Sequence, residues 1–363
     1  MDAPGTGRER DVVTTVPSHT QRHTHASGLH AVATALDDLH RDLIRATGAE
    51  SSQVRLSVLN ILAACNDASF IESTTSTVLE VAQRHPARVI VIMADRRGDP
   101  VIESDIALRH ADDGSHIELI RLEVRGEPAR HLASIVQPLL VPDIPVQLWL
   151  VGAPPLEQAF AADAVSVCDR VILDTATYPD AAETLRLIAA ELERHGDTLT
   201  LNDLAWERLQ PWRSAVAHAF EGATVRPWMH RVTGVDIVSS GRRSAMEGWL
   251  LAGWLSSRLG WRDTVSPEIA VSCVPHPSPL GPELLRLRLR CQEGKHRARI
   301  HVERRAHVLH TSIDIDAGVV ASGATALPQW SDAMLVGRLM SEIDDDPVFR
   351  GAVSEAARLA AAS

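Results

Sequence analysis

The segment Leu201–Arg213, with the sequence LNDLAWERLQPWR, separates two halves of the chain whose patterns of apolar residues differ. Its apolar side chains recur every three or four residues. This predicts a single helix that begins at Asn202 or Asp203, since either residue can cap a helix start. Pro211 lacks a backbone N–H group, so we expect the helix to kink or restart there. We refer to this segment as the joint helix, because its position predicts that it joins two domains.

Two interpretations of the aromatic and basic residues in the joint helix stay open. Trp and Arg are the residue types that dominate protein–protein contacts, because a rigid ring and a planar guanidinium give much contact area for little lost entropy. This makes Trp206, Arg208, Trp212 and Arg213 candidates for partner binding. Buried tryptophan is common in a chain of this size, and the spacing alone favours this second interpretation, an interdomain core.

Composition places the chain among ordinary globular proteins. It has 363 residues, of which 45% are hydrophobic and 23% are charged, and this length favours two domains over one. The formal net charge is −11. Such an acidic balance argues against a general nucleic-acid-binding protein.

Lysine occurs once, at Lys295, within a Glu-Gly-Lys-His turn. Phosphate-loop, Schiff-base and kinase sites each need a lysine in a defined context, and this turn matches none of them. The sequence also lacks a Gly-x-Gly-x-x-Gly string after a strand, a Gly-x-Ser-x-Gly elbow and a His-Glu-x-x-His motif. We therefore expect no catalytic residues and no bound cofactor.

The four cysteines, Cys65, Cys168, Cys273 and Cys291, are far apart and form no Cys-x-x-Cys pair. This spacing favours a reducing compartment and argues against a zinc site. No apolar run is long enough to span a bilayer, and the N-terminus lacks the apolar core of a signal peptide. The sequence therefore predicts a cytoplasmic protein without a metal site or a membrane partner.

The hydrophobic pattern predicts an α/β domain followed by a smaller α+β domain. Residues 1–28 are polar and are expected to be a disordered leader. Residues 29–198 alternate between apolar runs and helical periods, which indicates a mixed sheet with flanking helices. Residues 199–363 begin with the joint helix and contain clustered strands that predict an antiparallel meander.

A basic ribbon is the strongest local charge feature. Arg286, Arg288 and Arg290 alternate with leucines, so period two places the arginines on one face of a strand. Between residues 284 and 305 there are eight Lys and Arg residues and two Glu residues, a local charge of +6. An anionic partner or a phosphate ligand would explain this charge. The alternative is an edge strand whose charges only prevent aggregation.

Taken together, several strings resemble one known family, the glucose-6-phosphate dehydrogenase assembly protein OpcA family. The three strongest are HPARVIV at residues 85–91, LLVPDIPVQLW at 139–149 and LAWERLQPWR at 204–213. DRVILD at 169–174 and WLSSRLGW at 254–261 also fit. The resemblance covers roughly residues 50 to 345, and the combination of strings is specific.

The resemblance implies a non-enzymatic protein that binds glucose-6-phosphate dehydrogenase, promotes its active oligomer and raises its activity in the oxidative pentose phosphate pathway. It adds Trp149 to the candidate partner contacts and marks the motif residues His85, Pro86, Arg88, Asp143, Pro145 and Asp174. Some family members are linked to thioredoxin-dependent control through cysteines, and the cysteines here lack the close pairing for it. A sugar-phosphate-binding protein or enzyme that uses the α/β sheet is the alternative function.

Overall fold

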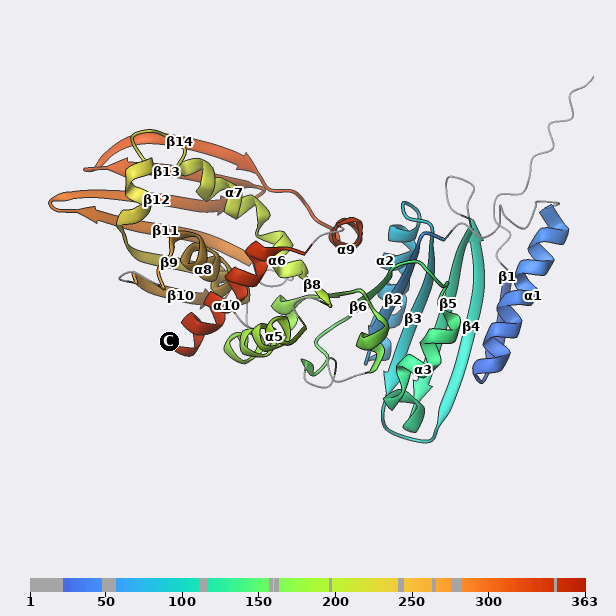
Figure 1. Ribbon diagram of the computed structural model, residues 1–363. Coiled ribbons are helices and arrows are strands. Elements are labelled where there is room, and N and C mark those ends of the chain that lie inside the picture. Colours follow the sequence, from blue (N-terminus) through green and yellow to red (C-terminus); the bar gives the residue numbers. More distant parts are fainter. Residues whose placement is uncertain are drawn as a thin grey trace, which may run out of the picture.

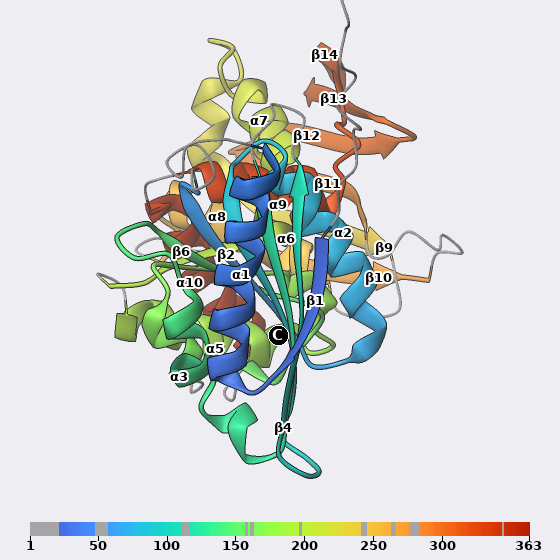
Figure 2. The same cartoon turned by 90° about the vertical axis from the view of Figure 1, so that its right-hand side faces the viewer.

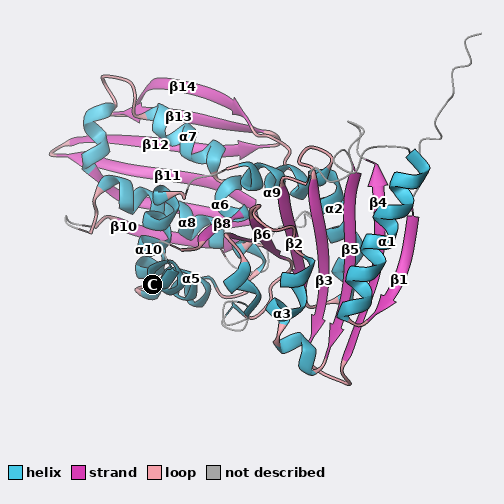
Figure 3. Cartoon of the chain, turned by 45° about the vertical axis from the view of Figure 1, so that its right-hand side comes forward, coloured by secondary structure: helices cyan, strands magenta, loops and turns pink. Residues whose placement is uncertain are grey.

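The structure is a computed structural model that describes residues 22–47, 57–110, 116–156, 159, 163–195, 198–240, 245–262, 266–275, 283–342 and 345–363. Two sheets, here called A and B, dominate the described part of the chain (Figure 1). In Figure 3 the helices α6 and α9 lie between the two groups of strands. The architecture is the predicted one, an α/β region followed by an α+β region.

Sheet A has eight strands in the order β1-β4-β5-β3-β2-β6-β7-β8. It is mixed, as the sequence predicts, because β4 pairs antiparallel with β1 and β5 while the other neighbours pair in parallel. The strands are β1 Arg22–Ser27, β2 Leu59–Cys65, β3 Ala87–Asp95, β4 Val101–His110, β5 His116–Arg125, β6 Val146–Leu150, β7 Arg170–Leu173 and β8 Thr200–Asp203.

Helices cover both faces of sheet A, which explains the continuous apolar runs in its central strands. Neighbours along β2 such as Ile61 and Leu62 are both fully buried, one in each of two hydrophobic clusters. One cluster includes α2 and α9, and the other includes α1, α3 and α5. These helices are α1 Leu29–Thr47, α2 Ile71–Ala82, α3 Leu132–Val136, α5 Ala181–His195 and α9 Asp332–Ser341.

Sheet B has six strands in the order β10-β9-β11-β12-β13-β14, and β11 to β14 form the predicted antiparallel meander. In Figure 2, α7 and α8 lie to one side of the strands β9 to β13. The elements are β9 Val232–Ser240, β10 Glu268–Val274, β11 Glu283–Glu293, β12 His296–Arg305, β13 Val308–Ile315, β14 Gly318–Ala326, α6 Leu204–Arg208, α7 Gln210–Ala219, α8 Met246–Leu259 and α10 Pro347–Ala361.

Six short 3-10 helices also occur in the described ranges, and three of them, η1, η2 and η5, directly follow strands. They are η1 Ala68–Phe70, η2 Glu127–Arg130, η3 Gln137–Leu139, η4 Asp163–Val167, η5 Thr175–Thr177 and η6 Arg226–Arg231. The sequence predicts one helix over residues 128–140, whereas the structure has η2, α3 and η3 there. The first division falls at His131, whose φ of −124° and ψ of 47° are not helical, and Pro138 explains the end of α3, because it lacks the backbone donor that a continuous helix needs there.

The predicted leader needs a correction. Residues 22–27 form β1, which pairs antiparallel with β4 at the edge of sheet A, and Gly28 then leads into α1. The rest of the predicted leader, residues 1–21, lies outside the described residues. β8 lies beyond residue 198, where the sequence predicts that the second domain begins, so sheet A takes its last strand from that second segment.

Candidate functional site

The first three residues of the joint helix segment, 201–203, belong to β8 in the structure. Its helical part therefore begins at Leu204. Asp203 caps the helix through a hydrogen bond from the Ala205 N–H at 3.0 Å. The same carboxyl group accepts hydrogen bonds from the Thr175 N–H at 2.9 Å and from the Thr175 hydroxyl at 2.6 Å. Burial, followed by the nearby Asp174 carboxylate, raises the pKa of Asp203 to about 7. A protonatable carboxyl group therefore joins β8, α6 and η5.

The predicted kink is confirmed, and it divides the joint helix into two. α6 ends at Arg208, Leu209 forms a turn, and α7 starts at Gln210 with Pro211 in its first turn. Proline fits this position because the first N–H groups of a helix have no partner within the helix. At the turn between the two helices, the Leu209 N–H donates a hydrogen bond to the Trp206 carbonyl, three residues earlier, at 3.1 Å.

Three consecutive residues of α6 contact four other parts of the chain. The Trp206 indole Nε1 donates a hydrogen bond to Asp346 at 2.8 Å, directly before α10. Glu207 pairs with Arg338 of α9 at 2.8 Å. Arg208 pairs with Asp174 after β7 at 2.6 Å and with Glu247 of α8 at 3.1 Å. α6 therefore connects sheet A with the helices that follow it in sequence.

Burial and neighbouring charges shift the pKa values of the ionisable groups at this junction. Burial raises the pKa of Glu207, and the nearby Arg338 opposes that shift. The pKa of Arg208 is raised by the carboxylates of Asp174 and Glu247 against the opposing effect of its burial. All three ion pairs are partly shielded from water, so removal of one partner leaves the other charge poorly solvated.

The tryptophans proposed as partner contacts are in the core, which corrects that prediction. Trp206 and Trp212 are each 3% exposed, and Trp149 of β6 is 5% exposed. Trp206 packs against Phe349 with ring centroids 5.6 Å apart, and the Arg213 guanidinium lies 3.5 Å from the Trp206 ring centroid. The physical reason is that α6 and α7 are enclosed by neighbouring elements on several sides, so their rings cannot reach a partner in this conformation.

A second set of contacts ties α9 to sheet A, and sequence reasoning missed it. The Arg170 guanidinium of β7 donates to the carbonyls of Leu339, at 3.1 Å, and Glu342. The Gln147 side chain of β6 donates to the Met340 carbonyl at 3.0 Å. The last carbonyls of a helix have no partner within it, so these donors satisfy the end of α9. The sequence gives only a weak signal for these contacts, because Gln147 and Arg170 are each a single polar residue beside an apolar run.

Two of the motif residues that resemble the family, Pro86 and Pro145, shape the start of β2. The carbonyls of Pro86 and Pro145 accept hydrogen bonds from Val58, at 2.9 Å, and Asn60, at 2.8 Å. Asp143, with φ of 62°, forms the left-handed turn between η3 and β6. Arg88 pairs with the buried Glu118, and its Nη1 donates to the Leu139 carbonyl at 2.7 Å.

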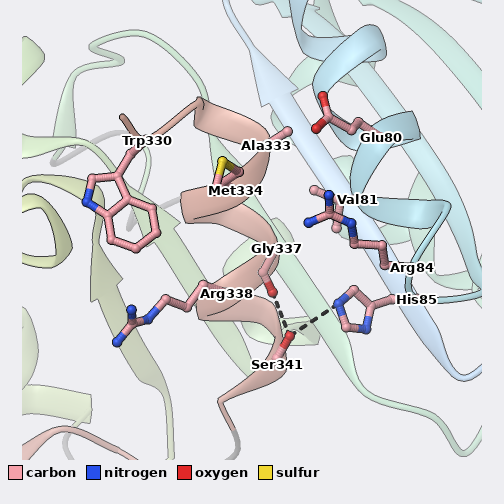
Figure 4. Close-up of a pocket in the computed structure, with 10 residues that line it drawn as sticks. All are labelled: Glu80, Val81, Arg84, His85, Trp330, Ala333, Met334, Gly337, Arg338 and Ser341. Carbon is pink, nitrogen blue, oxygen red and sulfur yellow. Dashed lines mark hydrogen bonds between the residues drawn. The ribbon is translucent and has the colours of Figure 1, made fainter. Parts of the chain in front are cut away.

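His85 lines a cavity of about 210 Å³ between α2 and α9 (Figure 4). Its Nε2 atom lies 3.2 Å from the Ser341 hydroxyl, which also donates to the Gly337 carbonyl at 2.7 Å. The lining combines Glu80 on α2 and Arg84 in the turn after α2 with apolar groups. Trp330 and Arg338, which also belong to the lining, lie on the side of α9 away from α2.

The arginines of the basic ribbon lie on one face of β11, as predicted, while Leu287 and Leu289 are buried on the other. β11 pairs with β9 on one side and β12 on the other. It is therefore an interior strand, and the interpretation of the ribbon as a charged sheet edge is wrong. Arg290 pairs with Asp236 at 3.3 Å and with Glu268 at 3.1 Å, so two neighbouring strands neutralise it.

Two other classes of site were sought among the described residues. No group of three or more His, Cys, Asp and Glu side chains in them is arranged to hold a metal ion. Over the same ranges, no helix has both the length and the apolar character needed to cross a bilayer.

Comparison with known families identifies the chain. Residues 78–190 match the model described as glucose-6-phosphate dehydrogenase subunit N-terminal domain, and residues 199–353 match the corresponding C-terminal domain. The chain belongs to the OpcA family. The boundary between the two matched regions falls directly before β8 and the joint helix.

Two curated OpcA relatives match about half of the chain. Both are named putative OxPP cycle protein OpcA. The relative from Synechococcus elongatus is 24% identical over 192 residues, and the one from Synechocystis sp. is 22% identical over 187 residues. Each match covers 50% of this chain and 41% or 38% of the relative. The chain thus matches about two-fifths of the length of these relatives.

Solved structures with a similar arrangement have low sequence identity to this OpcA family member. A dehydrogenase from Chromobacterium violaceum is 10% identical, with a TM-score of 0.43 over 85% of this chain and 94% of that one. A biliverdin reductase from Synechocystis sp. is 9% identical, with a TM-score of 0.37 over 84% of this chain and 99% of that one.

Proposed function

We propose that this chain is a non-catalytic assembly factor that acts in the cytoplasm, binds glucose-6-phosphate dehydrogenase directly and raises its activity in the oxidative pentose phosphate pathway. The observation that carries this proposal is the match to both OpcA domain models. Those models are described as domains of a glucose-6-phosphate dehydrogenase subunit. A subunit acts by contact, and a contact that favours the active oligomer would raise activity.

The polar groups at the strand ends support a non-catalytic role. Open α/β sheets bind their ligands at the carboxyl ends of strands, which is where sheet A places Asp174 and Asp203. Asp174 pairs with Arg208 and accepts from the Ala176 N–H at 3.1 Å, and Asp203 accepts from Thr175 and caps α6. The chemistry at these strand ends is therefore used to hold the junction together.

Activation by contact sets a thermodynamic condition. A protein that binds the active and inactive forms of an enzyme equally well shifts nothing, however tightly it binds. The chain must therefore bind the active form of the dehydrogenase more tightly. This requires contacts with the dehydrogenase that differ between its active and inactive forms.

Steady-state kinetics of the cognate dehydrogenase, with increasing amounts of this chain, test the proposal. We expect kcat to rise or KM for glucose 6-phosphate to fall until the chain saturates the enzyme, and we expect the chain alone to reduce no NADP. Analytical ultracentrifugation of the mixture should show a complex larger than either protein. Serum albumin at equal mass concentration is the control. Unchanged kinetics at saturating amounts of the chain would rule the activator role out.

A further inference from the structure

We propose that the face of sheet B opposite α7 and α8 is the docking surface of this chain, and that it binds an acidic surface of its protein partner. The inference rests on the proposed function, which makes that partner glucose-6-phosphate dehydrogenase. Among the described elements, α7 packs against β12 and β13, while α8 packs against β9, β10 and β11. Both contacts involve the face that buries the apolar residues of sheet B, and the basic side chains project from the opposite face.

The strand register brings the basic side chains together at the centre of this face. Arg288 of β11 lies directly opposite His301 of β12, and Arg286 lies two residues before Arg288 on the same face. Arg299 lies two residues before His301. Directly opposite residues on one face of an antiparallel pair are about 5 Å apart. The four side chains therefore form one compact cluster, which we call the basic cluster.

Among the described residues, the arginines of the basic cluster form no ion pair of their own, unlike Arg290, although a carboxylate lies opposite each of them on a neighbouring strand: Glu303 opposite Arg286, Asp236 opposite Arg288 and Asp314 opposite Arg299. Arg286, Arg288 and Arg299 form no ion pair or hydrogen bond with another side chain in the part of the chain that the structure describes. The Nε atom of Arg286 and the Nε2 atom of His301 are shielded from water, and neither has a hydrogen-bond partner in the described ranges. Carboxylates of a docked surface would instead pair with the outer nitrogens of these guanidinium groups, which form no ion pair in the described ranges.

The environment of His301 shows the same excess of positive charge. Its pKa is lowered first by burial and then by the nearby Arg288, with Arg286 and Arg305 acting in the same direction. Glu303 opposes this shift. A neutral His301 offers one N–H donor to a partner, and an incoming carboxylate would favour the charged form.

The distribution of acidic residues favours a protein surface over a nucleic acid. Asp236, Glu268, Glu303 and Asp314 lie on the same face as the basic cluster and surround it on β9, β10, β12 and β13. A continuous phosphate backbone would meet these carboxylates along its path. The chain as a whole also carries a net charge of −11. A partner with a limited acidic patch fits this pattern of charges better.

The size of the face and its border also fit a protein partner. Six strands are separated by five gaps of about 4.8 Å, and about eight residues of about 3.3 Å each set the length of the face, so its footprint is about 600 Å². This approaches the roughly 800 Å² that each partner contributes to a standard interface. At the edge strand β14, Val319 is 69% exposed and Val320 is 46% exposed. Val319 lies opposite Asp314, so an apolar border adjoins the charged face.

Association rates measured by surface binding test the docking surface. The test variant is Arg288→Glu with Arg299→Glu, and the matched control is Arg97→Glu with Arg186→Glu, which changes the net charge equally at exposed sites in the β3–β4 loop and on α5. At about 50 mM salt we expect the test variant to associate with the dehydrogenase about tenfold more slowly than wild type, with a smaller difference at about 500 mM. The control should associate at close to the wild-type rate.

The possible outcomes separate the docking surface from the proposed function. A test variant that binds and activates like wild type overturns the docking surface but leaves the function intact. A wild-type chain that does not bind the dehydrogenase overturns both. If wild type binds a duplex oligonucleotide more tightly than the dehydrogenase and the test variant does not, the face serves nucleic acid and the inference is wrong. Should the test variant melt early, Arg288→Gln with Arg299→Gln replaces it, with a smaller expected loss of rate.

Discussion

The Trp206 indole donates a hydrogen bond to the Asp346 carboxylate at 2.8 Å, although 140 residues separate them in the sequence. Asp346 also caps α10 by accepting from the N–H groups of Val348, at 2.9 Å, and Phe349, at 3.1 Å. One carboxylate thus fixes both the start of the last helix and its position against the joint helix. The tryptophan that resembles a partner contact in the sequence instead binds the two ends of the second half of the chain together.

Replacement of Trp206 should therefore affect folding more than partner binding. Trp206→Ala removes the contact with Phe349 and leaves Asp346 without the indole donor, so we expect the free energy of unfolding to fall by about 4 kcal/mol. Urea denaturation measures this, with Phe70→Ala at a 38% exposed ring as the control. Affinity for the dehydrogenase per folded molecule should not change. A variant with wild-type stability that no longer binds would show that Trp206 is a partner contact.

Arg208 should be the most sensitive charge in the junction. Arg208→Ala leaves the carboxylates of Asp174 and Glu247 facing each other in a partly buried space, and we expect it to lower the free energy of unfolding by about 3 kcal/mol. Arg186→Ala breaks an exposed ion pair within α5 and should leave stability close to wild type. Thermal melting of both variants makes the comparison. Equal melting temperatures would mean that the junction does not depend on this ion pair.

The pattern of apolar residues predicts most of the fold, and its failures have local causes. Continuous apolar runs predict β3 and β6, and helical spacing predicts α8 with both ends in place. β14 was missed because Gly318, Gly323 and several alanines give it no alternation and low strand propensity. All nine of its residues are exposed, so no buried apolar positions mark this strand in the sequence.

The candidate site depends on contacts between distant residues, which spacing does not reveal. Alternation predicts the common face of Arg286, Arg288 and Arg290. It gives no indication that Asp236 and Glu268 neutralise Arg290, since those residues reach it only through the pairing of β9, β10 and β11. The sequence likewise contains the tryptophans of the joint helix without showing what packs around them.

Close packing between α8 and α10 depends on Gly253. A Cβ atom at this position would lie 2.1 Å from the Ala352 carbonyl oxygen and 2.6 Å from the Ala356 nitrogen. Gly253→Ala should therefore push the helices apart and lower the free energy of unfolding by about 2 kcal/mol. Gly323→Ala in β14 is the control, because a Cβ there meets nothing within 4 Å. Urea denaturation of the two variants compares them, and similar midpoints would contradict the close approach of the helices.

The four thiols should differ in reactivity, and this bears on control by thioredoxin. Burial raises the pKa of Cys65 to about 11 and the pKa values of Cys168 and Cys291 to about 12. Cys273 is only partly buried, although burial also raises its pKa. The thiolate is the reactive form, so iodoacetamide should label Cys273 first in the native chain. Mass spectrometry over time identifies the labelled site. Cys273→Ser should abolish the early label, and early labelling of Cys168 would contradict this order.

The raised pKa of Asp203 predicts how stability depends on pH. The folded chain holds the Asp203 proton up to about pH 7, whereas an unfolded aspartate loses it near pH 4. The contribution of Asp203 to stability is therefore complete below about pH 4 and is lost as the pH rises through about 7. Asp203→Asn keeps the shape of the side chain without this titration. Between about pH 5 and about pH 8, wild type should lose stability relative to this variant, as urea denaturation followed by tryptophan fluorescence would show. A difference between the two proteins that stays constant over this range would mean that Asp203 is ionised throughout, and that its hydrogen bonds from Thr175 and Ala205 outweigh the cost of burying its charge.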